Sequence, residues 1–509
     1  MMHKPSKSNT MAPEGYDYID LGYDPYSFTE IYYNSLFSSF NLCSKIYRAF
    51  IDAYSSSFVL PEKEIVESEN PNTLMNFNWD GNFDKQLEFY KKYEKIILAK
   101  IRNTFDTKFR DKDFVNALSQ CVDLNCKLAK MAGMGFLYQQ FSYANSLLNN
   151  RYFEIFRDII YRTHSHKIHS EDNYSLFHYY TPQQDWTRQK SKGQSTLKLN
   201  TLSQKLDRIE QNTNNSTPLL IIYAFINRNY ILDLLPDSSV VRNFQNQGFD
   251  VYTTDWGTPS PYDKNLTLGN YVNGYLLDAV NHIIDHSNSD KVSLLGYCWG
   301  GDLSLMLAAL HPEKIENIVT FATPGDFRID NNLLSIWTRN MNANSLVDTF
   351  GNAPEVFINS SFLLRSPVDV LHKYPHFFLE GGKPKDMDSI LQFFATETWL
   401  YDSPPIPGEI YRQFVEDCYK KNLLINNEMV IGDRNKIDLK TIKHPFLNVI
   451  AKRDDLVDPK SSKAINDTVG SKDKSILEFD SGHVGACISS RAHEQLWPKV
   501  GQWLKKRKN

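Results

Sequence analysis

Cysteine is scarce in this chain of 509 residues, which holds six cysteines and no pair in a C-x-x-C spacing. The composition therefore indicates neither a disulfide framework nor a zinc site built from paired cysteines, and a reduced, cytoplasmic setting is expected. Long apolar runs are lacking too, and the first fifteen residues contain no apolar signal core. We therefore expect no membrane-spanning segment.

A strong excess of one charge is also missing. The net charge is -4, and charged residues make up 23% of the chain. Without a basic field, nucleic acid is not expected as a partner. The length exceeds what one compact core uses, so we expect two domains, or one domain with a large insertion.

Aromatic residues are plentiful at 13%, many of them in the first two hundred residues. We predict a disordered tail over residues 1–27, and a helical N-terminal region with a linker over residues 28–200. Apolar residues at three- and four-residue spacing predict the helices, in residues 31–54, 83–105 and 114–160. We interpret the polar stretch 170–217 as a linker or a peripheral segment. We interpret the aromatic stripes as core packing, with a surface for a partner protein or an apolar particle as the alternative.

A different pattern begins near residue 201 and predicts an α/β catalytic domain over residues 201–509. Buried strands alternate with helices, which implies a mainly parallel sheet with right-handed crossovers. The expected strands cover residues 218–225, 249–254, 291–295, 315–322, 445–451 and 475–480. The expected helices cover residues 239–246, 268–286, 302–310 and 491–506. The alternation stops over residues 327–443, which we interpret as an inserted helical cap over the site.

The chain is organised around residues 296–301, GYCWGG. A strand precedes this segment and a helix follows it, which is typical of a nucleophile elbow with cysteine in place of serine. Gly296 and Gly300 fit the close approach of strand and helix. We therefore predict that Cys298 is the nucleophile and that the backbone N–H of Trp299 donates to an oxyanion. The alternative is a buried structural thiol.

A nucleophilic cysteine needs a base, and the base needs an acid that orients it. In elbow enzymes both follow late strands, in the order nucleophile, acid, histidine. His483 lies between Gly482 and Gly485 after the last expected strand, and it is the predicted base. The acid is one of Asp454, Asp455 and Asp458, which share the preceding loop. The backbone N–H of Ile226, after the first strand, is the predicted second oxyanion donor.

Together these residues make the chain resemble the polyhydroxyalkanoate synthase family, closest to the catalytic subunit of the two-subunit (class III-like) type. The similarity extends over about residues 215–505. The segments that carry it are residues 219–234, 248–257, 296–301, 399–424, 451–459 and 482–485. Ungapped alignment within that resemblance places the family's acid at Asp454. The chain departs from the family by having Asp455 where histidine is usual, Asp458 where proline is usual, and a long helical N-terminal region.

The resemblance implies an α/β-hydrolase fold and an acyltransferase that polymerises 3-hydroxyacyl-CoA, with short units such as 3-hydroxybutyryl favoured. It also implies release of CoA through a covalent acyl-cysteine, without metal or organic cofactor. The implied partners are the growing polyester granule and either a second synthase subunit or a second copy of the chain, with the protein at the granule surface in the cytoplasm. Two alternatives stay open: a cysteine hydrolase of the dienelactone-hydrolase or thioesterase type, and a non-catalytic granule scaffold.

Overall fold

The computed structural model describes most of the chain from residue 102 onward. The described ranges are 102–131, 163–180, 218–329, 332–366, 387–432 and 435–507, with single residues between 30 and 99 and between 369 and 377. The expected tail at residues 1–27 lies outside them. So do residues 132–160 of the expected third helix and residues 181–217 of the expected linker.

The centre of the molecule is an eight-stranded sheet in the order β1-β2-β6-β3-β7-β8-β11-β12. All neighbouring pairs from β6 to β12 are parallel, while β1–β2 and β2–β6 are antiparallel. The bounds are β1 Ser165–Glu171, β2 Tyr174–Tyr179, β3 Leu219–Ile222, β6 Val251–Asp255, β7 Val292–Tyr297, β8 Ile315–Phe321, β11 Phe446–Ala451 and β12 Lys474–Phe479. The mainly parallel α/β fold expected from the sequence is confirmed.

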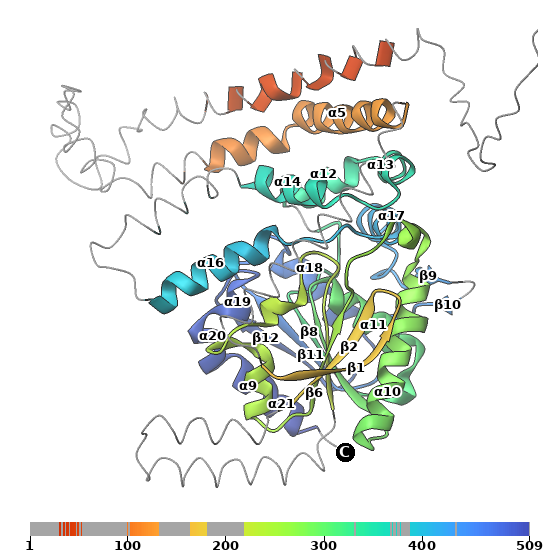
Figure 1. Ribbon diagram of the computed structural model, residues 1–509, viewed down its shortest axis with the longest axis vertical. Coiled ribbons are helices and arrows are strands. Elements are labelled where there is room, and N and C mark those ends of the chain that lie inside the picture. The colour runs from red at the N-terminus through yellow and green to blue at the C-terminus, as the bar shows by residue number, and fades with distance from the viewer. Residues whose placement is uncertain are drawn as a thin grey trace, which may run out of the picture.

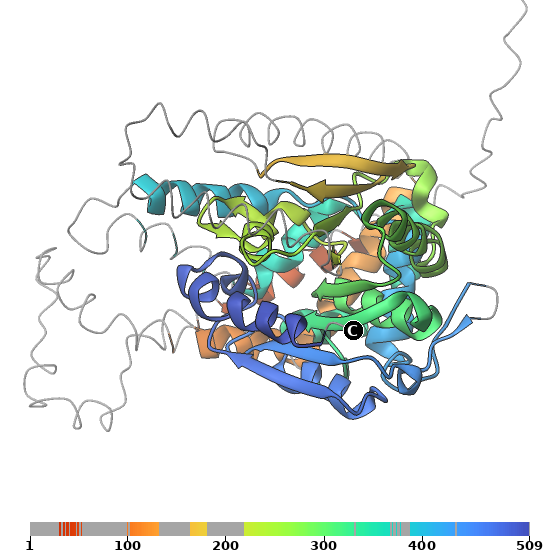
Figure 2. The same cartoon turned by 90° about the horizontal axis from the view of Figure 1, so that it is seen from below.

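Helices cover both sides of this sheet (Figures 1 and 2). Helix α9 lies beside α21 on one side, while α10 and α11 lie on the other (Figure 1). The helices outside the cap that accompany the sheet are α9 Val240–Asn246, α10 Leu277–Ser287, α11 Trp299–Leu310, α18 Pro459–Thr468, α19 Gly485–Ile488, α20 Ser490–Gln495 and α21 Trp497–Lys505. The expected helix at 268–286 contains a π-helical stretch, η3 Asn270–Leu276. The expected last helix is two helices, because a proline opens α21.

The strands β1 and β2 correct the expectation that a linker begins at residue 170. They form a hairpin whose turn residue Asp172 has φ 48°. Strand β2 pairs with β6 and buries Tyr174 and Leu176. The pattern was misleading because β1 lies at the edge of the sheet, where most of its side chains are histidine, lysine, serine or glutamate. Few apolar residues are needed at such an edge.

The inserted cap lies over the end of the sheet where the parallel strands finish, as the sequence indicated (Figure 1). Its helices are α12 Leu333–Asn340, α13 Ala343–Phe350, α14 Glu355–Arg365, α16 Met387–Tyr401, α17 Gly408–Gln413 and the π-helical η5 Phe414–Lys420. The ligands of a parallel α/β sheet bind at this end of the strands. The cap is therefore placed to cover a site there.

The N-terminal helices lie on the outer side of the cap (Figure 1). They comprise helical residues 102–110 and α5 Lys112–Met131. A separate apolar cluster joins them to the cap, with Phe105, Phe109 and Phe114 packed against Leu333 and Trp337 of α12. Among the described residues, no helix is both long and apolar enough to cross a membrane.

Candidate active site

Cys298 lies on a strained turn between β7 and α11. Its backbone adopts φ 54° and ψ -128°, a conformation that residues other than glycine rarely enter. Its N–H donates to the carbonyl oxygen of Phe321 on the neighbouring strand β8, at 2.9 Å. The half-buried thiol therefore lies at the end of the strand and at the positive end of the helix dipole.

The glycines around Cys298 allow this turn to form. A Cβ on Gly296 would collide with the backbone of Gly300 and Gly301, and a Cβ on Gly300 would collide with the carbonyl group of Ile222 on β3. Strand and helix thus approach more closely than any side chain permits. This close approach is what the spacing of the glycines indicated.

His483 lies in the loop after β12, and Asp454 lies in the loop after β11. The two side chains meet at 2.7 Å between Nδ1 of His483 and Oδ2 of Asp454. Both are buried, with 7% of the His483 side chain and 2% of the Asp454 side chain exposed. Cys298 lies beside this pair, because Cys298 and His483 line the same cavity. The structure therefore brings the predicted nucleophile, base and acid into one connected arrangement.

Only one of the three candidate acids points into this arrangement. The second oxygen of Asp454, Oδ1, accepts the backbone N–H groups of Leu456 and Val457, both at 2.9 Å. Asp455 instead bonds to Arg365 at 2.5 Å, and 61% of its side chain is exposed. Asp458 caps α18 by accepting the N–H of Lys460. The geometry favours Asp454 as the residue that orients His483.

The protonation of His483 depends on its neighbours. Burial alone lowers the pKa of a histidine, because it disfavours the imidazolium. Here the negative charges of Asp454 and Cys298, and the hydrogen bond to Asp454, outweigh burial and hold the pKa of His483 well above its usual value. An imidazolium at this position stabilises a thiolate beside it.

A buried carboxyl group lies one turn beyond the nucleophile, at Asp302 of α11. Its side chain is fully buried, and burial raises the pKa of this carboxyl well above its usual value. Burial thus favours the protonated, neutral form of this carboxyl over the charged one.

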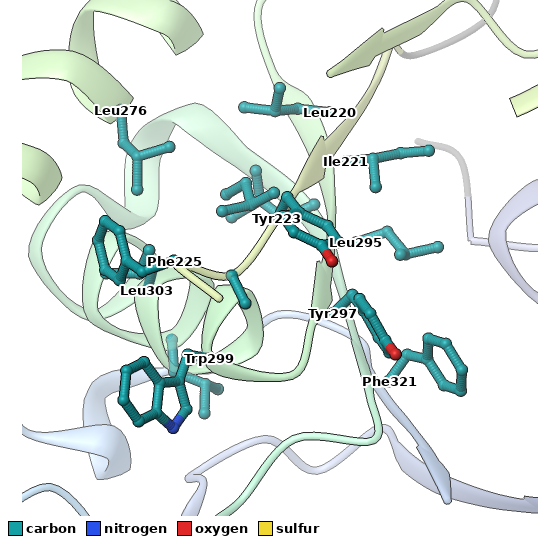
Figure 3. Packing of buried hydrophobic residues seen from close by; sticks show 14 of the residues in the cluster. Leu220, Ile221, Tyr223, Phe225, Leu276, Leu295, Tyr297, Trp299, Leu303 and Phe321 are labelled. Atoms are coloured by element: carbon teal, nitrogen blue, oxygen red, sulfur yellow. The ribbon is translucent and has the colours of Figure 1, made fainter. Parts of the chain in front are cut away.

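Aromatic side chains surround the elbow, and no sequence pattern indicated their roles. Figure 3 shows Tyr223, Tyr297 and Phe321 together on one side of the elbow, and Trp299 on the other. The ring of Tyr297 lies 5.1 Å from that of His483, between ring centroids. Trp299 stacks on Phe414 of η5 at 4.0 Å. The nucleophile thus lies between two rigid aromatic groups.

The two predicted oxyanion donors lie at the same end of the sheet. Trp299 is the first residue of α11, so helix geometry leaves its N–H without an intrahelical acceptor. Ile226 lies just after β3, in a bend of the chain. Their role as oxyanion donors stays a prediction.

The loop that carries Ile226 is anchored to the end of the cap by a buried network. Arg228 donates to Asp402 at 3.3 Å and to the carbonyl oxygen of Gly257 at 2.6 Å. Trp399 donates its indole N–H to the carbonyl oxygen of Arg228 at 2.7 Å. Sequence reasoning missed Arg228 and Asp402, although a charged residue so close to a buried strand is itself a signal.

The site opens into a cavity of about 470 Å³ under the cap. Cys298 and His483 lie in its wall, together with Ile226 and Tyr297. The cap contributes apolar wall residues, among them Phe362, Leu363, Trp399 and Leu400, and also the charged residues Arg365, Asp369 and Lys373. An acyl chain on Cys298 would thus meet both apolar and charged side chains of the cap.

The fold and this site define a protein of the α/β-hydrolase class with cysteine at the nucleophile position. A family model described as the alpha/beta hydrolase fold matches residues 217–486, and the chain belongs to that family. A monoacylglycerol lipase from Paleococcus ferrophilus superposes with a TM-score of 0.35 at 16% identity, covering 58% of this chain and 97% of the lipase.

Relatives of known name narrow the family further. The poly(3-hydroxyalkanoate) polymerase subunit PhaC of Thiocystis violacea is 40% identical over 296 residues, which is 58% of this chain and 82% of the relative. The same subunit from Allochromatium vinosum is 40% identical over 297 residues, covering 57% and 81%. The chain belongs to this poly(3-hydroxyalkanoate) polymerase family, which confirms the resemblance seen in its motifs.

Proposed function

We propose that this protein polymerises 3-hydroxyacyl-CoA into polyhydroxyalkanoate, releasing CoA and carrying the acyl chain on Cys298. The observation that supports this most strongly is the contact of Asp454 with His483 beside Cys298, in a chain of the polymerase family. Acyl transfer from a thioester to cysteine needs a thiolate nucleophile and an imidazole that is oriented to act as the base.

In the first step, the Cys298 sulfur attacks the thioester carbonyl carbon of the incoming unit. His483 takes the thiol proton, and Asp454 holds the ring so that Nδ1–H points to the carboxylate. The tetrahedral oxyanion accepts hydrogen bonds from the N–H of Trp299 and from that of Ile226. The C–S bond to CoA then breaks, and the CoA sulfur leaves with the proton. One thioester is exchanged for another, so the step is nearly balanced in free energy.

In the second step, a 3-hydroxyl group attacks the acyl group on Cys298. The hydroxyl belongs to the next unit or to the chain end. His483 takes the hydroxyl proton and returns it to the departing Cys298 sulfur. A new ester bond forms as the thioester bond to Cys298 breaks. When the attacking hydroxyl belongs to a 3-hydroxyacyl-CoA, the lengthened chain leaves as its CoA thioester. That thioester acylates Cys298 again by the first step and releases its CoA, so the polymer grows by one unit for each CoA released.

Water would hydrolyse the acyl-cysteine, so the site must exclude it. The cap residues Phe362, Leu363, Trp399 and Leu400, which cover the cavity with apolar side chains, support this role. The proposed chemistry needs no metal and no organic cofactor, because the thioester already carries the activated acyl group.

The proposed setting follows from the insolubility of the product. We place the protein in the cytoplasm at the surface of polyester granules, with 3-hydroxybutyryl as the favoured unit. A second synthase subunit or a second copy of the chain is the proposed partner. The helical N-terminal region, which contacts the cap, is a candidate for part of that subunit's role.

The experiment combines purified protein with 3-hydroxybutyryl-CoA and measures free CoA, insoluble polyester and free 3-hydroxybutyrate. CoA release with polyester and little free acid supports the proposal. Free acid in amounts equal to CoA would identify a thioesterase-like hydrolase instead. If no CoA is released, the second subunit of a two-subunit synthase is added. If CoA is still not released, the result favours the scaffold alternative.

A further inference from the structure

A second, smaller cavity of about 80 Å³ lies beside the one that contains Cys298. Ile226 and Phe362 line both cavities, so the two cavities adjoin at these two residues. Trp299, the residue after the nucleophile, lines only the smaller cavity. The side cavity therefore lies next to both predicted oxyanion donors.

The wall of the side cavity is mainly apolar and buried. Trp337, Met341, Ile358 and Val415 are each less than a tenth exposed. The hydroxyl of Ser361, also in the wall, already donates to the carbonyl oxygen of Phe357 at 2.9 Å. A cavity with such a wall favours an alkyl group over water, because water needs several polar partners.

We infer that this side cavity takes the alkyl substituent on the third carbon of the acyl unit bound to Cys298. The inference rests on the proposed function and adds a specificity subsite to it. With the carbonyl oxygen held by Trp299 and Ile226, the third carbon lies only two bonds from the carbonyl carbon. Its substituent is thus within reach of the space behind Ile226.

The size of the side cavity sets which substituents fit. A water molecule occupies about 30 Å³ in the liquid, and a methyl or methylene group is of similar size. The cavity therefore holds a substituent of one to about three carbons. The size of the side cavity thus favours short units. A longer alkyl chain would press on Met341, or on Ile226 and Phe362.

The roof of the side cavity is held from outside by the N-terminal region. Trp337 donates its indole N–H to the carbonyl oxygen of Phe109, at 3.2 Å, and its ring packs 6.3 Å from that of Phe109. Met341, just beyond α12, has no aromatic rigidity and is the wall residue most easily exchanged for a smaller one. Met341 is therefore the position at which the length limit is best tested.

The test compares kcat/KM for 3-hydroxypropionyl-, 3-hydroxybutyryl- and 3-hydroxyoctanoyl-CoA, measured by CoA release. The first substrate has no substituent on the third carbon, and the last has a five-carbon substituent that exceeds the limit. Met341→Ala enlarges the side cavity and should raise the octanoyl-to-butyryl ratio by about tenfold or more. Ser361→Leu fills it and should lower the butyryl-to-propionyl ratio by a similar factor. Because each ratio is taken within one variant, a general loss of folded protein cancels.

Leu363→Ala is the matched control, because Leu363 lines the main cavity but not the side cavity. It should change the three rates by similar factors. Unchanged ratios in both Met341→Ala and Ser361→Leu, or an equal shift in Leu363→Ala, would overturn the inference while leaving polymerisation in place. Failure of the proposed function itself would look different: the wild-type protein would form no polyester from any of the three substrates.

Discussion

The indole N–H of Trp337 in the cap donates to the backbone carbonyl of Phe109 in the N-terminal region, at 3.2 Å. The contact joins residues 228 positions apart in the chain. It does not stand alone, since Ser119 donates to Asn340 at 2.9 Å and Thr349 donates to Cys126 at 3.2 Å. The N-terminal helices thus brace the outer side of the cap.

Removing the centre of this brace should destabilise the protein. Phe109 is fully buried and stacks on Phe114 at 4.5 Å. We expect Phe109→Ala to lower the free energy of unfolding by about 3–5 kcal/mol and to speed amide hydrogen exchange in α12. Phe37→Ala, at a side chain 73% exposed, is the control and should change stability by less than about 0.5 kcal/mol. Equal effects of the two substitutions would show that the contact carries no stability.

Removing the sulfur of Cys298 should abolish CoA release. Cys298→Ala takes away the only side chain at the elbow turn that can accept the acyl group, and its small side chain fits the same turn. We expect turnover to fall to background while the circular dichroism spectrum stays that of the wild type. Retained turnover in a folded Cys298→Ala protein would move the nucleophile elsewhere.

The two neighbouring acids should differ sharply in importance. Asp454 contacts His483 in a buried position, whereas Asp455 forms an exposed pair with Arg365. We expect Asp454→Asn to reduce kcat on the order of 10⁴-fold, because the amide no longer orients or charges the imidazole correctly. Asp455→Asn should stay close to wild type, since an exposed ion pair contributes at most about 1 kcal/mol. The reverse order of effects would make Asp455 the acid.

The titration of His483 should depend on Asp454. In the folded protein, burial lowers the pKa of His483, but the charges of Asp454 and Cys298 raise this pKa by more than burial lowers it. The pKa therefore lies well above its usual value. Its contribution to stability is therefore complete below pH about 6.5 and is lost as pH rises through the folded-state pKa. With Asp454→Asn, burial should dominate and the pKa should fall.

Nuclear magnetic resonance of the protein with labelled histidine rings measures this directly. A His483→Gln variant identifies the resonance among those of the thirteen histidines. An imidazole that titrates at the same pH in wild type and in Asp454→Asn would contradict the electrostatic account of the site.

The positions of Cys298 and His483 could be derived from the sequence because both are local features. Glycines at a strand end force a turn, and the turn fixes where the next side chain points. The choice between Asp454 and Asp455 was not local, because both follow β11. It depends on which carboxylate turns inward against a histidine 29 positions away. The family resemblance favoured Asp454, and the structure gives the physical reason, since only the Asp454 carboxylate reaches His483.

Other features of the molecule left little trace in the sequence. The β1–β2 hairpin has no clear strand pattern in the sequence, because its edge strand β1 needs few apolar residues. The contact of Trp337 with Phe109 joins segments 228 positions apart, and no periodic pattern reports such a pairing. The network of Arg228 with Asp402 was missed for the same reason.

The central claim is that a polymer chain, rather than a single acyl group, is carried on Cys298. The most direct measurement supplies limiting 3-hydroxybutyryl-CoA, quenches in acid, digests the protein and determines the mass of the peptide that contains Cys298. We predict a series of masses that differ by one 3-hydroxybutyryl unit, with several units on the same peptide. A peptide that never carries more than one unit, together with free 3-hydroxybutyrate equal to the CoA released, would contradict polymerisation.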